Sequence, residues 1–554
     1  MNKVMRIINK NILYVAVSAM ALTSCIKDFQ EVNTNPLQAT DEEARRDGLA
    51  SGAYFNALVE RPIPTGTGVN PANDYQVIQN MTTDNWVGYF SPGRNHWDNG
   101  TNQTSYYMGD FRVNGTFNTL IEKVMNPYFK IKVAMHNVEA KDGKLVFTPK
   151  DLESRAVYSL AQIVKIMGMH RATDLFGPIP YSDMQPGKER AKYDSQEQVY
   201  KSFLKELNEA VTTLNEYGTG NKVLADFDAV YQGDTSKWIR LANSLMLRLA
   251  MRVRYADEAL AKEYVTKAIS NSGGLITDDS QAAKLVSNGR FVFHHSLVTM
   301  LGYGELKMGA TIYSYLKGYN DPRAEKYFTK TTAGGSSDFY AVRSGIDPNT
   351  GADVYKDFSV PTVITTTPTY WLRASEVQFL LAEATLANYI SGSAETYYNK
   401  GVEMSFIENG LTAAEATTYL AGTEKPANYN DPKKSNYSIT AVSTIGKGWS
   451  QATNDEEHLE QIITQKYLAN YPNGFESWSE WRRTGYPRMF PIPVNLSNKG
   501  AENVNSNGKD KGMRRFPFPE QEFRLNNENV TAAKSLLGGT DGTATNVWWD
   551  KKSK

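Results

Sequence analysis

The sequence predicts a mostly helical protein: a scaffold of tetratricopeptide-like helical hairpins with a loop-rich part inserted into it. Two observations support this fold class. Apolar residues recur at helical spacing in several long segments, which lie in neighbouring pairs joined by short connections. Between these segments are long stretches rich in Gly, Asn, Thr and Pro that lack this period. The chain does not contain a strictly repeated tetratricopeptide consensus. The pattern therefore predicts paired helices but does not identify the type of repeat.

The helices follow one another along the chain, and several carry recognisable end signals. They are expected at 41–57, 117–140, 151–171, 195–216, 237–255, 257–270, 371–389, 394–410 and 456–469. Pro127 should kink or split the second of them, because proline removes a helical hydrogen bond. Ser195 with Gln198 forms a capping box, and Asn454 with Glu457 caps the last helix.

The loop-rich stretches lie at about 61–116, 272–370, 421–453 and 484–554. Segments this long without caps or periodicity usually carry function in a compact protein. Short alternating runs at Leu145–Thr148 and Tyr340–Ser344 predict two small hairpins. We expect one domain over 41–554.

The N-terminus has the pattern of a secretory signal. The first ten residues include three basic residues and no acid, and an apolar run from Ile12 to Leu22 follows. This run is too short to span a bilayer. The ending Leu-Thr-Ser-Cys at Cys25 resembles a lipobox, so we expect 1–24 to be a lipoprotein signal peptide and 25–40 a lipidated tether. An ordinary signal peptide with a chance cysteine is the alternative. Asp28 and Glu31 resemble a signal for export to the outside of the outer membrane.

Composition excludes several classes of function. The chain has 60 basic and 60 acidic residues, so nothing favours nucleic acid as a partner. Cys25 is the only cysteine, which excludes disulfides and cysteine metal sites within the chain. The six histidines show no ligand spacing, so we expect no metal site and no cofactor. The oxygen-rich run Asp98–Asn102 does not follow the EF-hand order and leaves a calcium ion as an open alternative. The aromatic content is high, with 32 Tyr, 22 Phe and 9 Trp, as in many secreted sugar-binding proteins.

The acidic residues do not form a predicted catalytic pair. Glu376 and Glu383 lie seven residues apart, which is about 10.5 Å of helix rise. A glycosidase needs two carboxyl groups within about 5–9.5 Å. Arg373 is the expected partner of Glu376. The stripe Arg240, Ser244, Arg248 and Arg252 is expected to cap carbonyls and pair with acids of neighbouring helices, with an anion-binding row as the alternative.

The candidate ligand-binding residues lie in the first two loop-rich stretches. Rings beside Asp, Asn and Arg suit a sugar, which presents C–H faces and hydroxyls. The candidates are Asp84, Asn85, Trp86, Tyr89, Arg94, Trp97, Tyr106 and Tyr107, with Phe293 and Tyr303 facing them across a groove. Because the loop has no regular period, the rings of Trp86 and Trp97 are expected to lie outside the core. The alternative is that Trp86 and Tyr89 hold the loop onto the scaffold.

Several long, separated motifs resemble those of one family, the SusD/RagB-like lipoproteins, in the branch called SusD-like family 2. The motifs are Asp174–Tyr181, Tyr231–Asp234, Lys237–Leu245, Leu247–Arg252, Trp371–Val377, Ala382–Ala384, Gln461–Tyr467, Asn473–Glu476 and Trp478–Arg483. The resemblance spans nearly the whole mature chain.

This resemblance implies a right-handed helical scaffold on the cell surface, anchored in the outer membrane through the lipid on Cys25. Family members act as the lid of a SusC-like TonB-dependent transporter, capture glycans or in some cases peptides, and are not catalysts. A secreted glycosidase or peptidase and a pure protein–protein scaffold are the competing functions. Exposed loop aromatics would favour ligand capture over a scaffold.

Overall fold

The computed structural model describes residues 49–67, 69–93, 103–142, 144–347, 350, 353–499, 504 and 512–553. The chain divides into two units, residues 1–51 and 52–554. The second unit contains nearly all of the described residues. Cys25 and the expected signal peptide and tether lie outside the described residues.

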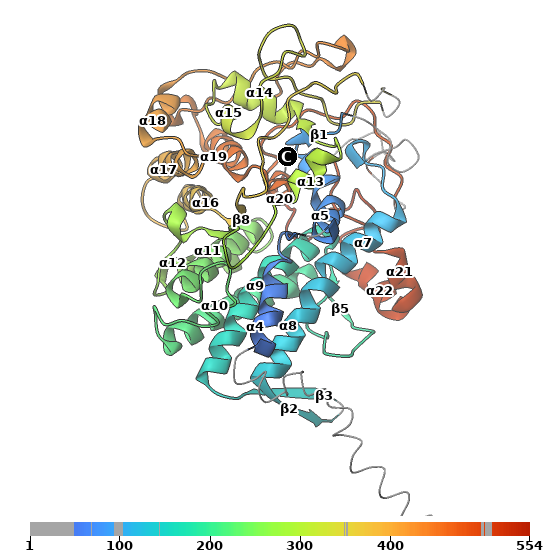
Figure 1. Cartoon of the computed structure of the whole chain (residues 1–554), viewed down its shortest axis with the longest axis vertical. Helices are drawn as coiled ribbons and strands as arrows, with labels where there is room; N and C mark the ends of the chain where they lie inside the picture. The colour runs from blue at the N-terminus through green and yellow to red at the C-terminus, as the bar shows by residue number, and fades with distance from the viewer. Residues whose placement is uncertain are drawn as a thin grey trace, which may run out of the picture. The chain divides into compact units, whose positions relative to one another are not determined.

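The scaffold consists of two groups of helices. The first is α8 (Glu122–Met135), α9 (Leu152–Phe176), α10 (Gln196–Tyr217), α11 (Thr235–Val253) and α12 (Glu258–Ser270), each packed on the next. The second is α16 (Ala374–Leu386), α17 (Ala394–Glu408), α18 (Ala413–Ala421), α19 (Asp455–Asn470) and α20 (Gly474–Thr484). Helix α11 packs on α16 and joins the groups into one scaffold; Figure 1 shows α10, α11 and α12 below α16, α17 and α19 on the left. The predicted helical-hairpin fold class is confirmed.

The predicted caps form as hydrogen bonds. Ser195 and Gln198 make both bonds of the capping box at the start of α10. At α19, the Asn454 side chain accepts the Glu457 N–H at 3.0 Å. These bonds satisfy backbone donors that the first helical turn leaves unpaired.

Two predicted helices begin or break at other residues. The segment expected at 117–140 is two helices, α7 (Asp110–Leu120) and α8, with the break at Ile121 and Pro127 inside α8. The prediction that the helix splits at Pro127 is wrong: the chain divides at Ile121, because α7 packs on η1 as well as on α9, whereas α8 packs along α9. The helix expected from Trp371 begins only at Ala374, since Trp371 belongs to strand β8 (Thr369–Leu372).

In the described residues, the strands form four two-stranded sheets. They pair β1 (Phe90–Ser91) with β7 (Lys307–Met308), β2 (His136–Lys141) with β3 (Lys144–Pro149), β4 (Ile179–Pro180) with β5 (Tyr193–Asp194), and β6 (Ala283–Leu285) with β8. The hairpin predicted at Leu145–Thr148 is confirmed as β2–β3. The one predicted at Tyr340–Ser344 is wrong: Val342 forms a single parallel bridge to Gly309.

The loop-rich stretches contain only short elements besides the strands. The first holds α4 (Leu49–Val59) at its edge, then α5 (Val69–Tyr75), the π-helix η1 (Gln76–Asn80), α6 (Thr83–Trp86), η3 (Gln103–Ser105) and the start of α7. The second holds η4 (Asp279–Gln281), α13 (Leu297–Gly302), α14 (Ala310–Gly318) and α15 (Ala324–Tyr327). Later come η5 (Ser435–Tyr437), η6 (Trp449–Gln451), α21 (Glu520–Leu525), α22 (Asn527–Ala533) and η7 (Lys534–Leu536).

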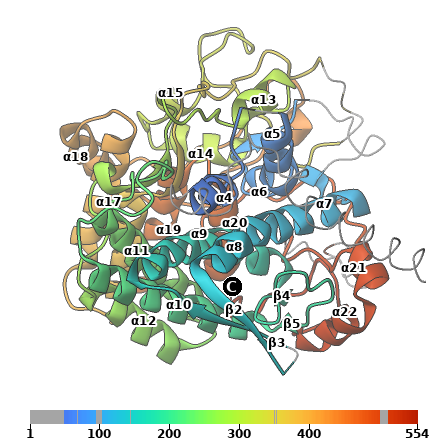
Figure 2. The ribbon, with the colours of Figure 1, turned by 60° about the horizontal axis from the view of Figure 1, so that its bottom comes forward.

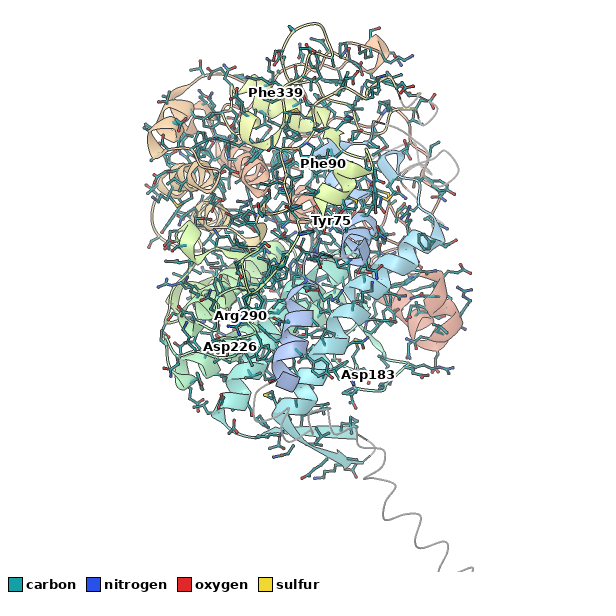
Figure 3. The ribbon with its side chains drawn as sticks, in the orientation of Figure 1. Tyr75, Phe90, Asp183, Asp226, Arg290 and Phe339 are labelled. Carbon is teal, nitrogen blue, oxygen red and sulfur yellow. The ribbon has the colours of Figure 1, made fainter. Side chains whose placement is uncertain are left out.

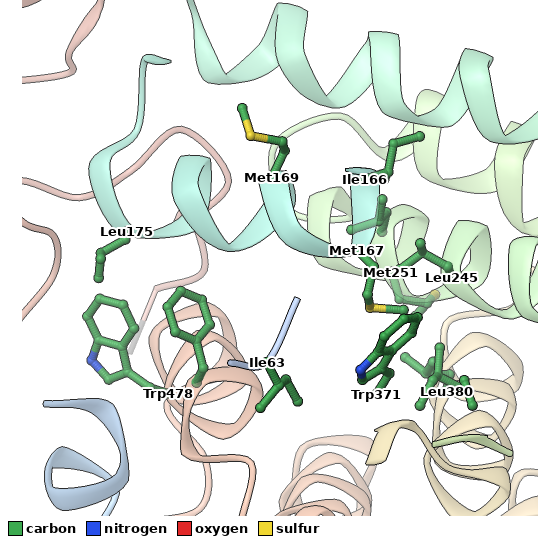
Figure 4. Packing of buried hydrophobic residues seen from close by; sticks show 14 of the residues in the cluster. Ile63, Ile166, Met167, Met169, Leu175, Leu245, Met251, Trp371, Leu380 and Trp478 are labelled. Atoms are coloured by element: carbon green, nitrogen blue, oxygen red, sulfur yellow. The ribbon is translucent and has the colours of Figure 1, made fainter. Parts of the chain in front are cut away.

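The main hydrophobic core extends through both groups of helices and into the loop-rich stretches. Figure 4 shows Met167 of α9 and Met251 of α11 near Trp371, with Leu380 of α16 beside the indole. Trp371 is only 1% exposed, so strand β8 places its indole fully in the interior.

A buried ion network also connects the helices. Arg248 of α11 donates to both carboxylate oxygens of Glu376 at 2.7 and 2.8 Å, and Arg252 pairs with Glu476 and Glu480. The predicted pairing of the arginine stripe with acids is confirmed. The expected Arg373–Glu376 ion pair is wrong, because α11 lies against α16 and its Arg248 binds the Glu376 carboxylate instead.

Candidate ligand-binding site

Asp84 lies inside the protein, and its carboxylate accepts three hydrogen bonds. Its oxygens receive Tyr75 Oη at 2.8 Å, Gln79 Nε2 at 3.0 Å and the Gly474 N–H at 2.9 Å. Tyr75 and Phe90 are marked in Figure 3 on the same side of the scaffold. A Cβ on Gly474 would meet Asp84 Oδ1 at 2.3 Å, so only glycine permits this approach at the start of α20. Asp84 therefore joins the first loop-rich stretch to the C-terminal core.

The carboxyl group of Asp84 gives a pH prediction. Burial raises its pKa from 3.8 to about 7, against the lowering effect of its three hydrogen bonds. The folded state thus holds this proton more tightly than the unfolded chain. The contribution of Asp84 to the free energy of unfolding should therefore fall by a few kcal/mol between about pH 4 and pH 7, at about 1.4 kcal/mol per pKa unit.

The measurement is urea unfolding of wild type and Asp84→Asn at several pH values. The Asn variant should be less stable than wild type at every pH, since its amide disturbs the acceptor site. Its free energy of unfolding should not show the decrease between pH 4 and pH 7 that titration of Asp84 causes. The wild-type advantage over the variant is expected to be largest at acid pH. An advantage that stays constant from pH 4 to pH 8 would contradict the assignment.

Trp86 and Asn85 are also buried, at 9% and 1% exposure. The Trp86 ring lies 5.3 Å from Trp478 and 5.8 Å from Phe516, and its Nε1 donates to the Gln103 carbonyl at 2.7 Å. The expectation that Trp86 lies outside the core is wrong. The segment has no period of its own, but α6 packs on α20, and that contact covers the ring.

Tyr89 is buried in the same way as Trp86. Its ring stacks on Tyr467 of α19 at 4.6 Å, and its hydroxyl lies 2.5 Å from the Tyr467 carbonyl and 2.7 Å from Ser477 Oγ. Its exposure is zero. The alternative reading, in which Trp86 and Tyr89 hold the loop onto the scaffold, is the one that agrees with their burial.

The remaining candidates of the first stretch differ in their surroundings. Tyr106 is 8% exposed and lies edge-on to Trp86 at 6.3 Å, whereas Tyr107 is only partly buried. Arg94 and Trp97 lie outside the described residues.

The second aromatic cluster does lie beside the first stretch. Strand β7 pairs with β1, matching Phe90 with Met308, and α13 packs on α5 and η1. Phe293 is buried at 7% and stacks on Phe291 at 6.5 Å. Tyr303, at the end of α13, is 36% exposed, and its hydroxyl donates to Asn73 Oδ1 at 3.4 Å. Of the two candidates, only Tyr303 presents its ring to solvent.

Helices α7 and α13 both pack on α5, which Figures 1 and 2 show between them, and each of the two carries an exposed ring, Phe111 on α7 and Tyr303 at the end of α13. We call Asn73, Tyr107, Phe111 and Tyr303 the ligand face. Phe111 is 72% exposed, with the Arg112 guanidinium 5.3 Å from its ring centre.

Phe111 is not among the residues predicted above, although the sequence carries a signal for it. The buried stripe of α7 is Val113, Phe117 and Leu120, at spacings of four and three residues. Phe111 falls outside that stripe, so it is a large ring on the polar face of an amphipathic helix.

Two further classes of site find no support in the described part of the chain. It contains no group of three or more His, Cys, Asp or Glu side chains suited to a metal ion. Within the same residues, no helix has the length and apolar content needed to cross a membrane.

Comparison with known proteins identifies the family. The SusD-like family model, described as Susd and RagB outer membrane lipoprotein, matches residues 31–550. This chain therefore belongs to the SusD-like family. The resemblance predicted from the motifs is confirmed.

Solved structures of this family share the fold. A SusD homolog from Bacteroides vulgatus is 30% identical and aligns over 92% of this chain and 99% of its own, with a TM-score of 0.82. A SusD homolog from Bacteroides uniformis is 32% identical over 91% and 99%, with a TM-score of 0.81. A chitin-binding SusD homolog from Flavobacterium johnsoniae is 31% identical over 91% and 99%, with a TM-score of 0.81. No curated protein matches the chain.

Proposed function

We propose that this chain is a lipid-anchored protein on the outside of the outer membrane. In this proposal it captures an oligosaccharide, delivers it intact to a SusC-like TonB-dependent transporter, and does not catalyse a reaction. Membership of the SusD-like family supports the location and the partner. The ligand face is the observation that supports capture.

The ligand face has the chemistry that a sugar requires. Phe111 and Tyr303 present flat apolar surfaces on which the C–H groups of a pyranose can stack. Asn73 supplies an amide that both donates and accepts, as sugar hydroxyls do. The description of one relative as chitin-binding favours a chitin-like oligosaccharide as the first ligand to test.

The acidic residues considered for catalysis already have other partners. Glu376 is held by Arg248, and Glu383 receives Arg254 at 2.7 Å and Arg483 at 2.6 Å. Because arginine donors occupy their oxygens, neither carboxylate is free to protonate or attack a substrate, which favours binding over hydrolysis.

Removing a ring of the ligand face should weaken binding without unfolding the protein. Phe111→Ala and Tyr303→Ala are each expected to lower the affinity for a chitin oligosaccharide by about 10–30-fold, because a stacked ring contributes roughly 2 kcal/mol. Isothermal titration calorimetry measures the affinity and thermal melting checks the fold. The recovered oligosaccharide should be intact after long incubation.

Tyr54→Ala is the matched control, because Tyr54 of α4 is 38% exposed and lies outside the ligand face. If no glycan on an array binds the wild type while peptides do, the peptide alternative replaces the glycan. Equal affinity in all three variants would remove the ligand face from the proposal.

The anchor is tested at Cys25. Cys25→Ser should move the protein from the membrane fraction to the soluble fraction, because acyl chains on this residue supply the proposed attachment. Fractionation in high salt, in cells lacking the transporter partner, is the measurement. A variant that remains in the membrane fraction under these conditions would show that another attachment exists.

A further inference from the structure

A narrow pocket lies inside the second unit. Its walls come from the chain before α5, from strand β8 and the start of α16, and from the end of α19, and they include Ile63, Trp371, Arg373 and Asn470. Figure 4 shows the indole nitrogen of Trp371 turned toward Ile63. Inside the pocket, the centre of a water-sized sphere can move through a volume of about 30 Å³. A group of two or three atoms fits there, but a whole sugar ring does not.

Three buried nitrogen donors of this pocket have no hydrogen-bond partner. They are Trp371 Nε1, Arg373 Nη1 and Asn470 Nδ2, on residues that are 1%, 8% and 3% exposed. Among the described residues that line the pocket, no buried side-chain acceptor lacks a hydrogen-bond partner. Buried donors without partners are costly and rare, so three in one pocket indicate an acceptor that enters it.

The surrounding acids are already engaged elsewhere. Glu376 lines the pocket, but Arg248 holds both of its oxygens. Glu408 lies 3.8 Å from Arg373 Nη1, beyond hydrogen-bond distance, and its oxygens receive the Ser375 N–H at 2.9 Å and Ser375 Oγ at 2.6 Å. Neither carboxylate satisfies the three donors.

The pocket also holds a neutral histidine. Burial lowers the pKa of His295 to about 4, so the ring is uncharged at neutral pH. Its Nδ1 accepts the Leu297 N–H at 3.3 Å, which places the proton on Nε2. Arg373 lies with its guanidinium 3.6 Å from the ring centre of Tyr370, which fixes the plane of its donors. The lining therefore offers N–H groups and one oriented positive charge.

We propose that this pocket binds a carboxylate group. A carboxylate accepts at two oxygens and donates at neither, which matches three N–H donors around a space of this size. The carboxylate of a uronic acid and the C-terminus of a peptide present the same chemistry. The site does not depend on the proposed function, because neither Phe111 nor Tyr303 lines the pocket.

Sodium formate is the probe, titrated into the full chain in detergent by calorimetry and by thermal melting. Formate is expected to bind and to raise the melting temperature, whereas formamide, its neutral analogue, has no effect at the same concentration. Trp371→Phe removes one N–H and keeps a ring, and it should weaken formate binding about tenfold. Trp449→Phe makes the same change at a ring stacked on His458 and should leave binding unchanged.

If Trp371→Phe does not fold, Asn470→Ala removes a donor that α19 contributes to the lining and should show the same loss. Glucuronate and glycylglycine then identify the source, and binding of either one supports the site. Phe111→Ala should leave formate affinity intact even if it abolishes glycan binding, which separates this test from that of the ligand face. Absence of a formate effect, an unchanged affinity in the Trp371 and Asn470 variants, or a formate-soaked crystal with only water in the pocket would overturn the proposal.

Discussion

Replacing Arg483 with Met is expected to lower the free energy of unfolding by about 3–5 kcal/mol, the usual cost of breaking a buried ion pair. Arg483 is completely buried on α20. Its guanidinium donates to both oxygens of Glu383 at 2.6 and 2.7 Å and to Glu480 at 2.6 and 3.0 Å. Without it, two buried carboxylates lose their strongest partner. Urea unfolding followed by circular dichroism measures the change.

The control is an ion pair with similar geometry on the surface. Arg290 donates to Asp226 at 2.7 Å, and both side chains are more than half exposed; Figure 3 marks them near each other. Arg290→Met should cost less than about 1 kcal/mol, because water screens the pair. Similar losses in both variants would mean that burial does not set the strength of these contacts.

Trp86→Ala is expected to lower the free energy of unfolding by about 3–5 kcal/mol, because it leaves a cavity between the first loop-rich stretch and α20. It also leaves the Gln103 carbonyl without the indole N–H. Phe111→Ala is the matched control, since the Phe111 ring is 72% exposed, and it should change stability by less than about 0.5 kcal/mol. If Trp86→Ala kept full stability and lost glycan affinity, Trp86 would belong to a binding site.

Local signals were enough to predict the scaffold. The capping box at Ser195 and the cap at Asn454 mark helix starts through bonds between residues three apart, so the sequence contains the whole interaction. The break at Ile121 was not predictable in this way. It depends on the packing of α7 against η1 and α21, which lie well away from it in the chain, and of α8 against α9.

The candidate site was predicted less well, for the same reason. Trp86 and Tyr89 lie in a segment without a period, which indicated exposure, but rings from α19 and α20 cover them. The sequence around Trp86 and Tyr89 does not show that rings nearly four hundred residues later in the chain bury them. Tyr303 and Phe111 are different, because each is a large ring that the packing of its own short helix leaves at the surface.

The contact between Asp84 and Gly474 joins residues 390 positions apart, and Tyr89 reaches Tyr467 over 378. Such pairs give this helical protein a high contact order, which slows folding because long loops must close before the contacts form. The first loop-rich stretch therefore cannot reach its final packing until the C-terminal core has emerged. In the proposed export of this chain, which starts at the N-terminus, this packing step must follow translocation of the C-terminal core.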